Sequence, residues 1–125
     1  MKVLVVHRQE AVLEDIKTQL SHWYIRTAYT GLDGLLATRL ELFDLILCSI
    51  DLPVVTGIEM VRSIRNFSIN QKTPVILLAE GNETPEHVRL LSLYKCQPAY
   101  HGRGKRNGRL EYYCLTKAQS LWLKI

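Results

Sequence analysis

The stretch DLILCSIDLPVVTG, residues 44–57, decides the fold. It begins with an apolar run of strand length and passes into a loop that contains Pro53 and ends at Gly57. An apolar run bounded by turn residues is typical of a strand covered on both faces, as in a parallel sheet. Residues 44–50 are therefore predicted to form a central strand that leads into a loop.

Apolar runs and helical stripes alternate along the rest of the chain. Strands are predicted at residues 2–6, 23–28, 44–50 and 74–79, with a short fifth strand near Ala99 and Tyr100. Helices are predicted at residues 9–21, 31–41 and 58–64, after an N-cap at Thr84, and at 110–125. This alternation indicates an α/β fold, a doubly wound five-stranded parallel sheet with helices on both faces.

The helix predicted at residues 31–41 has the most pronounced leucine stripe. Its members are Leu32, Leu35, Leu36 and Leu40. Residues three and four apart lie on one side of a helix, and such a stripe usually faces the core.

Length and composition indicate one globular domain, residues 1–125, in which the pattern is strong over 1–94 and weaker over 95–125. No apolar run approaches the roughly 20 residues that cross a bilayer, and the start MKVLVVHRQE lacks the features of a signal peptide. We therefore expect a cytoplasmic protein without membrane association. The three cysteines contain no C-x-x-C pair, so neither a metal site nor a disulfide framework is indicated.

The net charge of +4 comes from one segment, HGRGKRNGR at residues 101–109. It holds four basic residues and no acid, and the other 12 basic residues match the 12 acidic ones. Arg103, Lys105 and Arg106 can contact an acidic partner or a nucleic acid. The segment lacks a recognised nucleic-acid motif, so a solvated loop is the favoured interpretation.

Ligands of open parallel α/β sheets bind at the carboxyl ends of the strands. The residues at those ends are His7 and Arg8, then Ser49 and Asp51, and finally Ala79 with Glu80. Arg8 is expected to form an ion pair with Asp51 or Glu80, and His7 to fill the pocket as a hydrogen-bonded side chain. An anion held by Arg8, and a titrating or metal-binding His7, are the alternatives.

Three stretches carry a resemblance to a known family: KVLVV at the start, AYTGLDGLLATRLELFDLILCSIDLPVVTGIEMVRSIR in the middle, and TPVILLA. The chain resembles the receiver (CheY-like) domain of two-component response regulators, whose fold is flavodoxin-like. The resemblance covers residues 1–94 well and 95–125 loosely. It implies a signalling module in a phosphorelay-type system and not an enzyme.

The family's chemistry uses five positions, and this sequence departs from them. The resemblance places His7 and Arg8 where the family has two acids that hold Mg²⁺, and Ser49 where it has the phosphoacceptor aspartate. Ala79 stands where a Thr or Ser is expected. The lysine that normally precedes a proline has no secure counterpart, because Gln97 precedes Pro98. The resemblance therefore implies an atypical receiver domain.

The physical consequence is that Mg²⁺ binding is expected to be lost. Mg²⁺ prefers carboxylate and water oxygens, whereas Arg8 repels a dication. A serine can form only a phosphate ester and needs a base to activate its hydroxyl. No cofactor is therefore expected, and the domain is predicted to act by protein contact without phosphorylation. A domain phosphorylated on Asp51 with unusual metal ligands remains an alternative, and so does a nucleic-acid-binding module that uses residues 101–109.

The resemblance also implies the partners. In this family the last strand and helix often form the surface for a partner or a homodimer, so the candidate surface here comprises Tyr100, Arg103, Lys105, Arg106, Tyr113 and Trp122. The partner is a signalling protein or an attached output domain, such as that of a transcriptional regulator.

Overall fold

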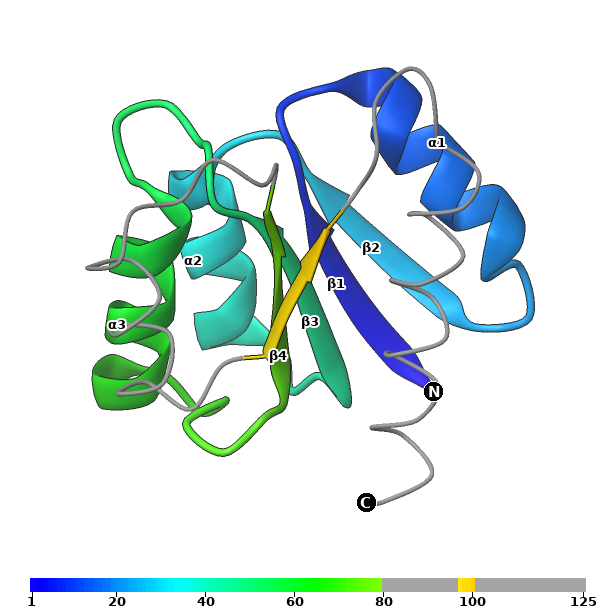
Figure 1. Ribbon diagram of the computed structural model, residues 1–125. Coiled ribbons are helices and arrows are strands. Elements are labelled where there is room, and N and C mark those ends of the chain that lie inside the picture. The colour runs from blue at the N-terminus through cyan, green and yellow to red at the C-terminus, as the bar shows by residue number, and fades with distance from the viewer. Residues whose placement is uncertain (80–96, 101–125) are drawn as a thin grey trace.

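The computed structural model describes residues 1–79 and 97–100. Strands and helices alternate along these residues, as the hydrophobic pattern predicts (Figure 1). The strands are β1 (Lys2–Val6), β2 (Tyr24–Ala28), β3 (Leu45–Ser49), β4 (Val75–Ala79) and β5 (Gln97–Tyr100). The helices are α1 (Glu10–Gln19), α2 (Gly31–Leu40) and α3 (Gly57–Phe67).

The strands form a single five-stranded sheet in the order β2-β1-β3-β4-β5, and every neighbouring pair is parallel. The predicted parallel sheet is confirmed. The central strand β3 has five residues, all of them buried, as expected for a strand covered on both sides. Its register aligns Ser49 with Leu78 of β4 and Cys48 with Val6 of β1.

Helices cover both faces of the sheet, with α2 and α3 on one side and α1 on the other (Figure 1). Because side chains alternate along a strand, each strand contributes to two separate cores. The core beneath α2 and α3 contains the strand residues Leu4, Val6, Ile46, Cys48, Val75 and Leu77. The core beneath α1 contains Val3, Val5, Leu45, Leu47, Ile76 and Leu78.

The leucine stripe of α2 does not face the core. Leu32, Leu36 and Leu40 are 67%, 57% and 67% exposed, whereas the buried residues of this helix are Gly31, Gly34, Ala37 and Thr38. The reason lies at Gly34, where an added Cβ would come within 2.9 Å of Val6 Cγ2 and 2.8 Å of Met60 Cε. Close packing on β1 and α3 requires small residues, so the small face turns inward and the leucines turn outward. The usual inward interpretation of the stripe is wrong for these three residues.

One buried amide joins three segments at the opposite edge of the sheet from the loops after β1 and β3. The Asn70 side chain donates to the carbonyl oxygens of Thr38 (2.7 Å) and Glu41 (2.8 Å) at the end of α2. Its oxygen accepts from the Phe43 backbone N–H (2.8 Å) and the Thr73 hydroxyl (3.0 Å). Asn70 is only 1% exposed, so it satisfies polar groups that water does not reach.

Some predicted elements lie outside the described residues, namely the helix after Thr84 and the helix at 110–125. Among residues 1–79 and 97–100, no helix has the length and apolar character needed to cross a bilayer.

Candidate functional site

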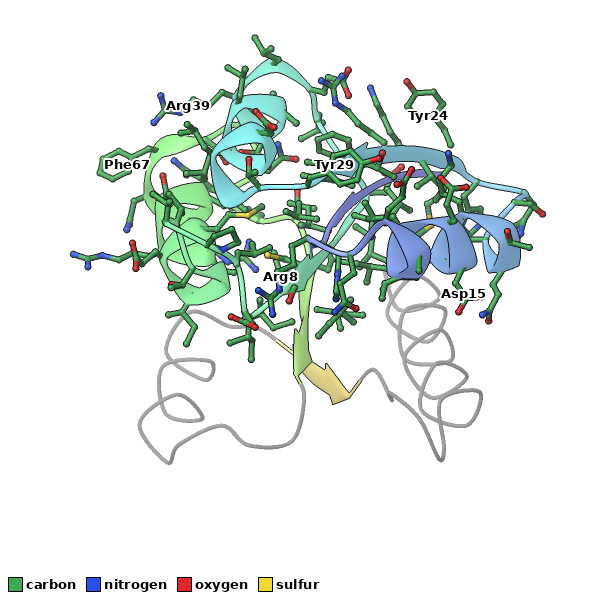
Figure 2. All side chains as sticks on the ribbon, turned by 90° about the horizontal axis from the view of Figure 1, so that it is seen from above. Arg8, Asp15, Tyr24, Tyr29, Arg39 and Phe67 are labelled. Atoms are coloured by element: carbon green, nitrogen blue, oxygen red, sulfur yellow. The ribbon has the colours of Figure 1, made fainter. Side chains whose placement is uncertain are left out.

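The candidate site lies at the carboxyl edge of the sheet, where parallel strands end together. His7 and Arg8 follow β1, and Ser49 ends β3. Asp51 lies in the loop between β3 and α3. Figure 2 shows Arg8 in the gap between α1 and α3, beyond the end of β1.

The ion pair predicted for Arg8 is present. Its Nη2 lies 2.9 Å from Oδ2 of Asp51, so the loop after β1 is tied to the loop after β3. The side chains are 49% and 57% exposed, and water therefore weakens the attraction. The pair therefore contributes little to stability, but it places a guanidinium against the carboxylate of the β3–α3 loop.

Ser49 is held by its own loop. Its side chain is buried, and its Oγ accepts a hydrogen bond from the Asp51 N–H (3.2 Å) and donates to the Asp51 carbonyl oxygen (3.3 Å). Such local bonding is typical of serine in turns. The hydroxyl of Ser49 is therefore engaged in holding the turn.

His7 is 7% exposed, and its Nδ1 accepts a hydrogen bond from the Gln9 backbone N–H at 3.0 Å. Because Nδ1 accepts, it carries no proton in this arrangement. Gln9 is the N-cap residue of α1 and its side chain makes no capping bond. The imidazole of His7 thus satisfies a backbone donor at the start of α1, as expected for a hydrogen-bonded pocket residue.

Backbone contacts hold the loop from β3 to α3 close to the sheet. Ile50 donates to the carbonyl oxygen of Leu78 (3.2 Å), and Gly57 donates to that of Ile50 (3.0 Å). A Cβ at Gly57 would lie 2.2 Å from the Ser49 carbonyl oxygen. Glycine is required there because the start of α3 passes directly over the end of β3.

Val54 adopts a backbone conformation that a β-branched residue rarely takes. Its φ is +67°, and the Val55 N–H donates to the Pro53 carbonyl oxygen at 2.8 Å, which makes Pro53–Val55 a γ-turn. Val54 is also 97% exposed. The loop is thus strained at its tip, next to the ion pair.

The described residues contain no group of three His, Cys, Asp or Glu side chains that can hold a metal ion. Within the loops that follow β1 and β3, residues 7–9 and 50–56, Asp51 is the only carboxylate, and Arg8 is bound to it. The described hydrogen bonds of the Ser49 Oγ go to the backbone of Asp51 and not to a basic side chain, so Ser49 lacks the arrangement of an activated nucleophile.

Other predicted site residues are placed only in part or not at all. Ala79 ends β4 and pairs in register with Tyr100, the last residue of β5. Glu80, Arg103, Lys105, Arg106, Tyr113 and Trp122 lie outside the described residues. The structure thus brings together His7, Arg8, Ser49 and Asp51, and it leaves the candidate partner surface untested.

Sequence reasoning missed two residues. The sequence LPVVTG does not distinguish Val54 from Val55 as the residue with a strained backbone, because either valine could occupy the tip of the loop. Asn70 was missed because it lies in the polar stretch NFSINQK, whose character indicates a solvated loop. Pro53, which directly precedes Val54, is a weak signal for the first residue, and no local signal marks the second.

Known proteins resemble the chain in sequence. Response regulator ArlR of Staphylococcus aureus (strain Mu50 / ATCC 700699) is 29% identical over 89 residues, which are 70% of this chain and 39% of that protein. The same protein from strain MW2 matches equally. The chain thus spans well under half the length of these curated relatives.

Solved structures resemble the chain in fold. A CheY-like response regulator receiver domain protein from Methanospirillum hungatei JF-1 aligns with a TM-score of 0.80 and 20% identity, covering 98% of this chain and 94% of that one. Chemotaxis protein CheY4 of Vibrio cholerae aligns with a TM-score of 0.75 and 23% identity, covering 93% and 96%.

The sequence profile of the response regulator receiver domain matches residues 3–94, which is most of the chain and includes every residue of the Arg8–Asp51 site. The matched segment extends from β1 through β4, and β5 (Gln97–Tyr100) lies beyond it. The chain therefore belongs to the response regulator receiver domain family.

Proposed function

We propose that this receiver domain transmits its signal through protein contacts and does not use an aspartyl-phosphate cycle. The observation that carries the proposal is the 2.9 Å ion pair between Arg8 and Asp51. It stands at the edge of the sheet where the family resemblance expects carboxylates around Mg²⁺. The positive charge of the Arg8 side chain thus takes the place of the metal ion, and the site does not bind one.

The donor set supports the loss of Mg²⁺. This ion takes six oxygen ligands in near-octahedral geometry, commonly one or two carboxylates with waters. Asp51 can supply one carboxylate, but its oxygen is already paired with the guanidinium of Arg8. The imidazole of His7 accepts from a backbone N–H and offers no oxygen. The residues at this site therefore do not fit Mg²⁺.

The phosphoacceptor position supports the same proposal. Ser49 is 3% exposed, and its hydroxyl bonds to both backbone groups of Asp51. Serine cannot form an acyl phosphate, and moving its hydroxyl toward a phosphodonor would break the turn. Ala79 ends β4 with a methyl group, which cannot bond a phosphoryl oxygen.

The proposed partner follows from the greater length of the curated relatives. The curated relatives are more than twice as long as the part this chain matches, so an attached output domain, such as that of a transcriptional regulator, is the proposed recipient of the signal. A separate signalling protein is the other form that such a recipient can take. In both cases the domain acts as a binding module and not as an enzyme.

The experiment is incubation of the chain with a small phosphodonor and Mg²⁺, followed by intact-mass measurement. We expect no adduct of about 80 Da, the approximate mass of a phosphoryl group. The positive control is the variant His7→Asp, Arg8→Asp, Ser49→Asp and Ala79→Thr, which restores four of the five family positions and should gain the adduct. Circular dichroism shows whether that variant folds. If it does not fold, Ser49→Asp alone is tested as a second variant, and it should stay unmodified.

Phosphorylation on Asp51 is the alternative that this experiment decides. Asp51 is half-exposed and carries the one carboxylate of the loop between β3 and α3. An adduct on the unaltered chain that disappears in Asp51→Asn would contradict the proposal. An adduct that remains in Asp51→Asn would indicate a different acceptor and would contradict it as well.

A further inference from the structure

The outer face of α2 presents an apolar ridge to solvent. Leu32, Leu36 and Leu40 lie four residues apart and are 67%, 57% and 67% exposed. Residues at this spacing form one continuous ridge on a helix. Large apolar side chains that gather in one exposed patch mark interaction surfaces, whereas scattered ones do not.

Two opposite charges flank this ridge symmetrically. At about 100° per residue, Asp33 lies about 60° to one side of Leu36 and Arg39 about 60° to the other. Both side chains are exposed, and neither forms an ion pair with a residue in the described part of the chain. Figure 2 shows Arg39 projecting outward from α2 into solvent.

We propose that this face, made of Leu32, Asp33, Leu36, Arg39 and Leu40, binds a second copy of the chain. In the commonest class of helix packing, the ridges of residues four apart run side by side and the axes cross at about −50°. Two α2 helices can pack in this way about a two-fold axis that runs along their ridges, with both helices pointing in the same general direction. The tilt then brings Asp33 of each copy beside Arg39 of the other.

This arrangement is self-complementary, which favours a second copy over a different partner. A two-fold interface requires that one patch match itself. The leucines meet at the centre, and two equivalent Asp33–Arg39 pairs close the flanks. The opposite helix direction instead places Asp33 on the same flank as Asp33 of the other copy, which is unfavourable. The face carries no net charge, so it does not suit a nucleic acid.

The size of the ridge sets the expected affinity of the dimer. A standard interface buries about 800 Å² per partner, and three leucines with two flanking charges provide less. We therefore expect a weak, reversible dimer with a dissociation constant on the order of micromolar. Burial of the leucines supplies the attraction, and the exposed ion pairs set the register and the choice of partner.

The test is sedimentation of the full chain between about 1 and 100 µM. The mass should rise with concentration from 14.4 kDa toward twice that value. Leu36→Glu should stay monomeric throughout, while Ile69→Ala, which removes an apolar residue that is 59% exposed but lies off α2, should behave as the unaltered chain. Circular dichroism confirms that each variant folds. A monomer at every concentration, or a Leu36→Glu dimer, would overturn the proposal.

A charge-exchange experiment tests the pairing itself. Asp33→Arg and Arg39→Asp should each weaken self-association about tenfold or more, because each creates two like-charged pairs. An equimolar mixture of the two variants should recover association, since every Arg then meets an Asp of the other chain. No recovery on mixing would rule out this two-fold arrangement. Arg8→Ala should dimerise normally, because the proposal does not depend on the site at the edge of the sheet.

Discussion

At the scale of single residues, Val54 stores strain in the loop beside the Arg8–Asp51 pair. Its φ of +67° is costly for a β-branched side chain, by about 1–3 kcal/mol. Because the side chain is 97% exposed, shortening it removes no buried contact. Val54→Gly should therefore raise the free energy of unfolding by about 1 kcal/mol, after allowing for the greater entropy of glycine in the unfolded chain.

Thermal and urea unfolding measure this effect. Val55→Gly is the matched control, because Val55 is partly buried against the core and Val54 is the described non-glycine residue with positive φ. That control should lower stability. A lower free energy of unfolding for Val54→Gly would show that the valine stabilises the turn by more than its backbone strain costs.

The Arg8–Asp51 pair should contribute little to stability despite its short distance. Both side chains are about half-exposed, and exposed ion pairs couple by roughly 0.2–1 kcal/mol. A double-mutant cycle with Arg8→Ala and Asp51→Ala should give a value in this range at low salt, and about 0.5 M NaCl should reduce it. A coupling energy well above this range, or one insensitive to salt, would mean that the pair is desolvated in solution.

At the scale of elements, Asn70 joins the end of α2, the start of β3 and the loop after α3. Asn70→Ala leaves the Phe43 N–H and two helix-end carbonyl groups without their partner in a site that is 1% exposed. Each unsatisfied buried group costs about 1–3 kcal/mol. The free energy of unfolding should fall by about 3 kcal/mol or more.

Asn66→Ala provides the comparison, because Asn66 is exposed and donates only one described side-chain bond, to the Arg62 carbonyl oxygen. Its effect should stay within about 0.5 kcal/mol. Equal losses for the two variants in urea titrations would show that the Asn70 network does not hold in solution.

At the scale of the whole molecule, Mg²⁺ should leave stability unchanged. A ligand that binds only the folded state raises its stability, by about 1.4 kcal/mol at ten times the dissociation constant. The unaltered chain should show no shift in melting temperature in about 10 mM MgCl₂, whereas the variant His7→Asp and Arg8→Asp, which adds two carboxylates beside Asp51, should melt higher in Mg²⁺. The same experiment with NaCl of equal ionic strength separates binding from screening. A specific rise for the unaltered chain would contradict the loss of the metal site.

Much of this architecture is predictable from the chain alone. Residues 3–6 and 45–48 are unbroken apolar runs, and such runs are typical of a sheet covered on both sides, so the parallel sheet and its helices are predicted. The convergence of His7, Arg8, Ser49 and Asp51 follows too, because the ends of neighbouring parallel strands meet at one edge. Oppositely charged residues brought to that edge have few other partners, which is why the Arg8–Asp51 pair was predictable.

Tertiary structure alone decided three features. Leucines spaced along α2 indicate a helix, but which side faces inward depends on how closely β1 and α3 approach Gly34, and that distance is not encoded in the spacing. The strain at Val54 arises because β3 and α3 are both anchored and the loop must close between them. Asn70 joins groups up to 32 residues away, and a network of that separation leaves no local pattern. Periodicity therefore determines which elements form, whereas the packing of neighbouring elements determines which of their faces remain free.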